Sequence, residues 1–159
     1  MRTIKFKGKC LNPKNGKEFA YGSLLTFPDG SARIFEHDHD KVFNYFSVDP
    51  TTVCQFTGFY DTNGKKIYEG DVLCSDEYPY SYLKGVQRDN YFAVVYYCEE
   101  RACFGIVMAK NPLSKVLSVF DGVTDDVEQV EMKNFEVVGN IHEDEWKQYG
   151  EHFLDNEDL

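Results

Sequence analysis

The stretch from Val53 to Val72, VCQFTGFYDTNGKKIYEGDV, decides the fold class because strand-forming segments alternate in it with turn signals. The aromatic and apolar residues of 53–60 predict a strand, since such side chains pack well on a pleated surface. Asn63-Gly64 favours a tight hairpin turn. A second strand is predicted over 67–74, with Gly70 at a bulge or a tight bend.

The same pattern of short apolar runs and turns continues on both sides of this stretch. It predicts an all-β chain of about nine short strands, arranged as a barrel or a sandwich. Residues 75–90 form a long polar loop, of a length that is often functional. We expect an acidic tail over residues 143–159, where apolar spacing favours one short helix and Gly150 disfavours it. The strands outside the central stretch are expected at 3–7, 19–27, 32–35, 42–48, 91–98, 103–108, 116–120 and 135–142.

The predicted core follows from the apolar positions of these strands. It consists of Ile4, Phe6, Tyr21, Leu24, Phe56, Ile67, Val72, Val94, Phe104, Ile106, Val137 and Ile141.

Charge and cysteine usage narrow the functional classes. The 159 residues carry a net charge of −10, yet residues 1–35 hold seven basic side chains against two acidic ones. Residues 141–159 hold seven acidic side chains against one basic. We expect neither a signal peptide nor a membrane span, because no long apolar run occurs. The five cysteines form no C-x-x-C pair, which indicates free thiols in a reducing cytoplasm.

Three segments in this order resemble the YopX family of bacteriophage and prophage proteins. They are the N-terminal Ile4–Gly8 with Tyr21–Leu24, the central Val48–Val72, and the C-terminal Phe135–Ile141. The resemblance implies a phage-derived protein in the cytoplasm of a bacterial host. It also implies one YopX-like domain over 1–159, with an N-terminal β-subdomain (1–52) and an SH3-like small barrel (53–142) before the tail. It carries over no activity, and the family-motif positions are Gln55, Thr57, Gly58, Asn63, Gly64, Glu69, Gly70 and Asp71.

These motif positions have a structural interpretation. Glycines 58 and 70 allow backbone geometry that a side chain blocks. Gln55, Thr57 and Asp71 are expected to form a buried polar network that fixes strand register.

Signals for catalysis and cofactors are weak. No Gly-rich phosphate loop, nucleophile elbow or H-E-x-x-H motif is present, so we expect no enzyme and no cofactor. His37 and His39 share a strand face and need a third ligand, such as His142, to hold a metal; a solvated loop is the favoured alternative. Glu69 and Asp71 are paired carboxylates, which we assign to a turn rather than to acid–base chemistry. Cys98 and Cys103 face each other across a predicted hairpin, as a redox pair or as two buried thiols.

Three functional classes remain. The first is a non-catalytic protein-interaction or assembly module, whose partner is a second copy or a host or phage protein. The second is nucleic-acid binding through the basic N-terminal strand with Lys5, Lys7 and Lys9, although these lysines also fit an ordinary solvated strand face. An enzyme is the third. An acidic C-terminal half that imitates DNA is a further alternative, and a solvated tail explains the same acids.

Exposed aromatic side chains define the predicted interaction surface, because Tyr and Trp are enriched at interface hot spots. We expect a homo-oligomer, or a monomer that awaits a partner, with this surface at the contact; the alternative is a tail that folds back over an open barrel end. The surface consists of Tyr78, Tyr80, Tyr82 and Leu83 in the long loop and of Trp146, Tyr149, Phe153 and Leu154 in the tail.

Overall fold

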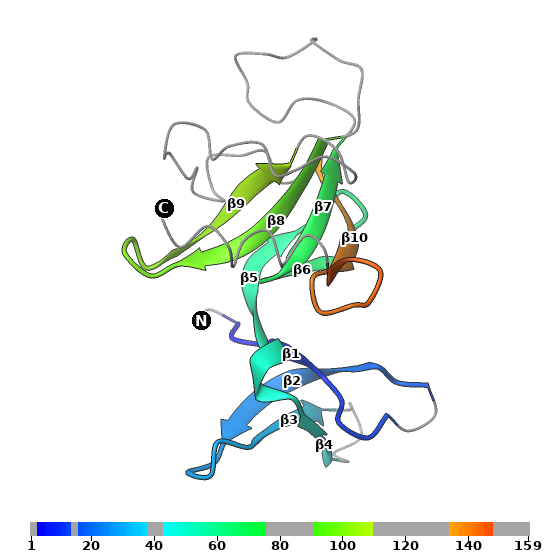
Figure 1. Ribbon diagram of the computed structural model, residues 1–159, viewed down its shortest axis with the longest axis vertical. Helices are drawn as coiled ribbons and strands as arrows, with labels where there is room; N and C mark the ends of the chain where they lie inside the picture. Colours follow the sequence, from blue (N-terminus) through cyan, green and yellow to red (C-terminus); the bar gives the residue numbers. More distant parts are fainter. Residues whose placement is uncertain (1–2, 14–15, 38–42, 76–90, 110–133, 148–159) are drawn as a thin grey trace. The chain divides into compact units, whose positions relative to one another are not determined.

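Strands account for nearly all the regular structure in the described part of the chain. The computed structural model describes residues 3–13, 16–37, 43–75, 91–109 and 134–147 (Figure 1). The chain divides into an N-terminal unit, Met1–Gly58, and a C-terminal unit, Phe59–Leu159. The described strands are β1 (Phe6–Lys9), β2 (Phe19–Thr26), β3 (Ala32–His37), β4 (Phe43–Val48), β5 (Cys54–Tyr60), β6 (Lys66–Tyr68), β7 (Asp71–Ser75), β8 (Tyr91–Cys98), β9 (Cys103–Ala109) and β10 (Glu136–Asn140), with one 3₁₀ turn, η1 (Pro50–Thr52). The prediction of an all-β chain is therefore confirmed.

The N-terminal unit is an antiparallel sheet in which β4 also contacts the end of β1. β1 to β4 pair in sequence order, and β5 pairs with the other side of β1. A single bridge joins Cys10, just after β1, to Val48 at the end of β4. Beside it the amide of Leu11 donates to the Ser47 carbonyl at 3.0 Å. The four strands therefore curl until β4 returns to the end of β1.

Small side chains fill the inside of this curl. Its buried cluster consists of Cys10, Ala20, Ala32, Ile34 and Val48, with Phe6, Leu24, Phe46 and Val53 packed against it. The strands approach each other closely: a Cβ on Gly22 would lie 2.0 Å from the Phe35 carbonyl oxygen. Because a side chain at Gly22 has no room, the alternation of β2 places Ala20 and Gly22 inside and Tyr21 outside.

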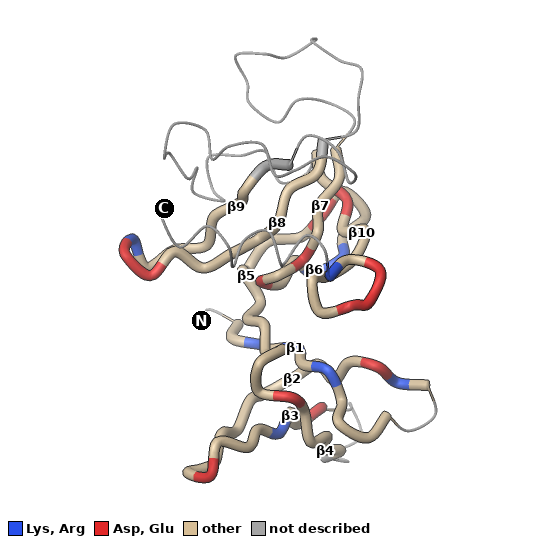
Figure 2. The backbone as a smooth tube through the Cα atoms, in the orientation of Figure 1, with Lys and Arg blue, Asp and Glu red and all other residues tan. Residues whose placement is uncertain are grey.

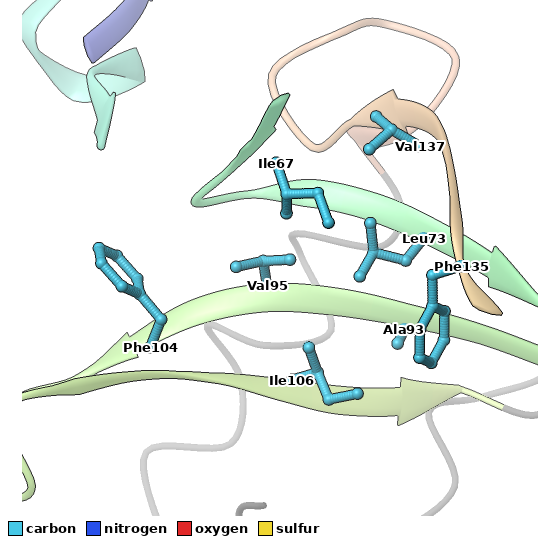
Figure 3. Close-up of a cluster of buried hydrophobic side chains, with 8 residues drawn as sticks. All are labelled: Ile67, Leu73, Ala93, Val95, Phe104, Ile106, Phe135 and Val137. Carbon is cyan, nitrogen blue, oxygen red and sulfur yellow. The ribbon is translucent and has the colours of Figure 1, made fainter. Parts of the chain in front are cut away.

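The C-terminal unit contains a four-stranded antiparallel sheet in the order β10-β7-β8-β9. One face of this sheet carries a core in which side chains from five strands point toward one another (Figure 3). The core consists of Ile67, Leu73, Ala93, Val95, Phe104, Ile106, Phe135 and Val137. The other face carries Val72, Phe92 and Val94, and Trp146 packs against this second cluster. Both faces of the sheet are thus covered by apolar contacts.

Most of the predicted core is confirmed, and two positions are wrong. Ile4 is 60% exposed and Tyr21 is 46% exposed. Tyr21 points outward because Ala20 and Gly22 occupy the crowded inside of the curl, and Ile4 precedes β1. The predicted core residues that are buried are Phe56, Ile67, Val72, Val94, Phe104, Ile106 and Val137; Phe6, Leu24 and Ile141 are half-buried.

Some strand boundaries differ from the prediction. The strand expected over 67–74 is interrupted at Glu69–Gly70, where Gly70 adopts a positive φ of 73°. The tight bend expected at this glycine is confirmed. The strand expected at 116–120 and the tail from residue 148, with most of its expected helix, lie outside the described residues. The SH3-like barrel stays a prediction, since the structure shows two antiparallel sheets.

Candidate functional site

The turn at 61–65 is organised by the side chain of Asp61, which is buried. Its Oδ1 accepts hydrogen bonds from the amides of Asn63 and Lys65, both at 2.8 Å. Its Oδ2 accepts the amide of Val137 in β10 at 3.0 Å. Gly64 takes the left-handed conformation, with φ 76°, and its amide donates to the Asp61 carbonyl at 3.0 Å. The Asn-Gly turn is confirmed, and its aspartate also anchors the distant strand β10.

The bend at 69–71 is organised by a second buried aspartate, Asp71, only 1% exposed. Its two oxygens accept the amide of Tyr68 at 2.7 Å and the side-chain amide of Asn140 at 2.9 Å. The Gly70 amide donates to the Val95 carbonyl at 2.7 Å, and the Gly70 carbonyl accepts from Ile141 at 2.9 Å. The Glu-Gly-Asp motif therefore ties the bend to β8 and to the end of β10.

Two buried carboxylates, Asp71 of the motif and Asp61 beside the Asn63-Gly64 turn, thus anchor β10 in the C-terminal unit. Asp61 and Asp71 bind opposite ends of β10, so two carboxylates fix its register against the rest of the unit. Asn140, fully buried, is the partner that our sequence analysis missed. The sequence feature that points to Asn140 is its position beside Gly139, within the segment Phe135–Ile141 that resembles the YopX family. Glu69 is half-buried, and its carbonyl accepts a hydrogen bond from the Asn140 side chain at 3.3 Å.

The remaining motif positions belong to the N-terminal unit. Gln55 is half-buried and lies opposite Phe6 in the register of β5 with β1. Thr57 is buried, and Gly58 ends the unit with a positive φ of 98°. The hydrogen-bond partners of Asp71 include Tyr68 and Asn140, and the expected network of Gln55, Thr57 and Asp71 stays a prediction.

The predicted interaction surface is described at one position only. Trp146 is half-buried, and its ring lies 6.3 Å from that of Phe92. It also covers Gly139, where a Cβ would come within 2.1 Å of the indole Nε1. The indole therefore packs on its own unit. Tyr78, Tyr80, Tyr82, Leu83, Tyr149, Phe153 and Leu154 lie outside the described residues.

An exposed aromatic surface occurs instead on the outside of the N-terminal unit. We call it the outer aromatic face, and it consists of Tyr21, Leu25, Phe27, Arg33, Phe35 and Tyr45. Tyr21, Leu25 and Tyr45 are 46%, 46% and 58% exposed. The register places Phe35 directly between Ser23 and Tyr45, so one row of the sheet crosses three strands. The rings of Phe35 and Tyr45 lie 5.8 Å apart.

Arg33 is the charged centre of the outer aromatic face. Its guanidinium lies 4.9 Å from the centroid of the Phe27 ring and 5.2 Å from that of Tyr45. Such cation–π contacts hold the exposed guanidinium in place between two rings. Asp29 lies in the nearby turn. The hydrogen bond from the Ser31 hydroxyl lowers the pKa of the Asp29 carboxyl group, and the Arg33 charge adds a smaller effect in the same direction.

The lysines of the N-terminal strand do not form the open basic row that sequence alternation predicted. Lys7 is only 5% exposed, and its ammonium lies 5.2 Å from the Phe19 ring centroid. Lys9 pairs with Glu18 at 3.3 Å. Lys5 is exposed. Figure 2 marks the charged positions along this unit.

The remaining candidates for metal binding and redox chemistry are histidines and cysteines. His37 is exposed, and its ring nitrogen lies 3.4 Å from the Ser23 hydroxyl; His39 lies outside the described residues. Within the described ranges, no three His, Cys, Asp or Glu side chains gather as a metal site. Cys98 and Cys103 are direct partners in the β8–β9 register, and neither is part of a disulfide.

Comparison with known proteins identifies the family of the chain. No curated protein matches the chain. In the described part of the chain, no helix has the length and apolarity that a membrane crossing needs. The family described as YopX protein matches residues 13–145, a range that contains both carboxylate-anchored turns and the outer aromatic face. The chain therefore belongs to the YopX family.

Proposed function

We propose that the protein is a non-catalytic, phage-derived interaction module that binds a partner protein through the outer aromatic face. The observation that carries this proposal is the Arg33 guanidinium, held between the exposed Tyr45 ring and the half-buried Phe27 ring on the outer sheet face. Tyr and Arg are the residue types that dominate interface hot spots, and contiguous exposed apolar surface is uncommon on monomers.

The chemistry of the face defines the partner. The side chains that β2, β3 and β4 direct outward within the described residues include one arginine and no carboxylate. Glu36, which alternation places on the inner side of β3, is paired with Lys17 at 2.5 Å. The face therefore fits an apolar patch rimmed by acidic side chains. A second copy meets the acidic requirement, because residues 59–159 hold 21 acidic against nine basic side chains.

Nucleic-acid binding is the second candidate. Aromatic rings on a sheet face, next to a cation, also stack single-stranded bases. However, the buried Lys7 and the paired Lys9 remove two of the three lysines on which a phosphate-binding strand depends. This arrangement favours a protein partner over a polyanion.

The test compares two pairs of exposed tyrosines. A protein captured from a bacterial host lysate is purified, and its affinity is measured for the wild type and for Tyr21→Ser/Tyr45→Ser. We expect the affinity to fall at least about tenfold, as for hot-spot residues. The matched control, Tyr60→Ser/Tyr97→Ser, removes tyrosines that are 50% and 41% exposed in the C-terminal unit and should bind like the wild type.

Two results would overturn the proposal. Equal affinity of the wild type and the Tyr21/Tyr45 variant for every captured protein excludes this face as the contact. Binding of single-stranded DNA that falls steeply between two salt concentrations, and that the same two substitutions abolish, assigns the face to nucleic acid. Light scattering of the pure protein, with and without the substitutions, identifies a second copy as the partner.

A further inference from the structure

We propose that Cys98 and Cys103 form a modification site, a pair of thiols that hydrogen peroxide joins into a disulfide. Cys98 is the last residue of β8 and Cys103 is the first residue of β9, and the two are direct partners in the antiparallel register. Neither cysteine is part of a disulfide and both are half-buried, so a small oxidant reaches them. This inference is independent of the outer aromatic face.

The hairpin register brings the two backbones within the range that a disulfide spans. Paired residues of an antiparallel ladder have Cα atoms about 4.5–5.5 Å apart, inside the range of about 4.4–6.8 Å found in disulfides. The turn that closes the hairpin is well defined, because the Ala102 amide donates to the Glu99 carbonyl at 3.3 Å. Ala102 adopts a positive φ of 53°, which a non-glycine residue adopts infrequently. The charged tip of this hairpin is visible beyond β8 and β9 in Figure 2.

The other three cysteines differ from this pair. Cys10 and Cys54 are buried in the N-terminal unit, and burial raises the pKa of the Cys10 thiol, which disfavours its reactive thiolate. Cys74 is half-buried but lies opposite Phe92, at the far end of β8 from Cys98. Six residues of strand separate these positions by roughly 20 Å, which no disulfide spans. Within the C-terminal unit, Cys103 is thus the partner in reach of Cys98.

The reaction balances with one equivalent of peroxide. The thiolate of one cysteine attacks a peroxide oxygen, the O–O bond breaks, and a sulfenic acid and one water form. The second thiolate attacks the sulfenic sulfur, the S–O bond breaks, and the second water leaves. Two electrons pass from the two sulfurs to the peroxide oxygens. The product is a ring that closes the tip of the hairpin, and a thiol reductant reopens it.

Peptide mapping of the native full-length protein tests this proposal. The protein is treated with hydrogen peroxide, its remaining thiols are blocked with N-ethylmaleimide, and it is digested with trypsin. Trypsin cleaves after Arg101, between the two cysteines, so peptides 89–101 and 102–110 separate unless a disulfide joins them. We expect the joined pair, two hydrogen atoms lighter than the sum of its parts, and its loss after reduction with dithiothreitol.

Single serine variants supply the controls. Cys98→Ser and Cys103→Ser should each lose the joined peptides, whereas Cys74→Ser should form them as the wild type does. Separate peptides that carry sulfinic acid, or a link from either cysteine to Cys74, would overturn the proposal. The wild-type digest decides the matter by itself if a variant fails to fold.

Discussion

The two units of this chain differ in the apolar surface that they expose and in the carboxylates that they bury. The N-terminal unit packs small residues inside and leaves Tyr21, Leu25 and Tyr45 on its outer surface. The C-terminal unit covers both faces of its sheet with apolar contacts and buries Asp61 and Asp71 with their hydrogen-bond partners. In the C-terminal unit the buried carboxylates hydrogen-bond neighbouring strands, whereas the N-terminal unit exposes the aromatic surface that we propose as the contact for a partner.

The role assigned to the C-terminal motif predicts the largest effect for Asp71→Ala. The substitution leaves the buried amide of Tyr68 and the side chain of Asn140 without their acceptor. Unsatisfied buried donors cost about 1–3 kcal/mol each, so we expect a loss of about 3–4 kcal/mol in unfolding free energy. Urea unfolding followed by fluorescence measures it, because Trp146 is the single tryptophan and belongs to this unit.

The near-isosteric Asp71→Asn is the control for this substitution. It keeps one acceptor oxygen and should lower the free energy of unfolding by less than Asp71→Ala does. An Asp71→Ala protein that unfolds at the wild-type urea concentration would show that the motif does not stabilise the unit.

The tight inside of the N-terminal unit predicts the next effect, for Gly22→Ala. The new Cβ meets a backbone carbonyl, which moves only if β2 and β3 separate. Overpacking of this kind costs about 3 kcal/mol. Thermal unfolding by circular dichroism should show the loss, and Ser23→Ala, at the exposed neighbouring position, should be close to neutral. Equal stability of the two variants would contradict the close approach of these strands.

A smaller effect is expected for Gly139→Ala, because here the Cβ meets a side chain that can swing away. Displacing the Trp146 ring should cost about 1–2 kcal/mol and shift its fluorescence emission to longer wavelength. The same glycine substitution made together with Trp146→Phe should cost less than it does alone, since the clash involves the indole. Unchanged emission of Gly139→Ala would show that the indole does not cover this glycine.

Removing residues 143–159 deletes Trp146 and therefore tests its packing on Phe92 and Gly139. We expect a lower melting temperature and an unchanged oligomeric state in light scattering, because Trp146 packs on its own unit. A truncated protein that changes its oligomeric state would instead place the tail at an interface.

The smallest effect on stability is expected for the tyrosines of the outer aromatic face. Tyr21→Ser and Tyr45→Ser each remove an exposed ring, and surface substitutions change stability by about 0.5 kcal/mol or less. Thermal unfolding of both variants should therefore resemble that of the wild type. A large loss at Tyr45 would mean that its ring serves the fold, through Arg33 and Phe35, rather than a partner.

The sequence predicted the local features well where neighbouring residues decide them. The all-β class, the Asn63-Gly64 turn, the bend at Gly70 and the pairing of Cys98 with Cys103 depend on alternation, on positive-φ glycines and on short hairpin spacing. The family followed from the spacing of the same turn motifs. Each of these features is written in a few consecutive residues or in two short segments joined by a turn.

The candidate surfaces depended on tertiary structure. Alternation gives two faces for β2 but does not say which face is inside; the close approach of β3 at Gly22 made that choice and put Tyr21 outside. The same argument applies to Lys7, which alternation assigned to solvent and the fold buried. Asn140 became the partner of Asp71 only because β10 and β7 pair across a long separation in the chain. By itself the sequence determined the strands and the turns, whereas packing between strands decided which side chains face water, because burial is a property of the neighbours and not of the residue.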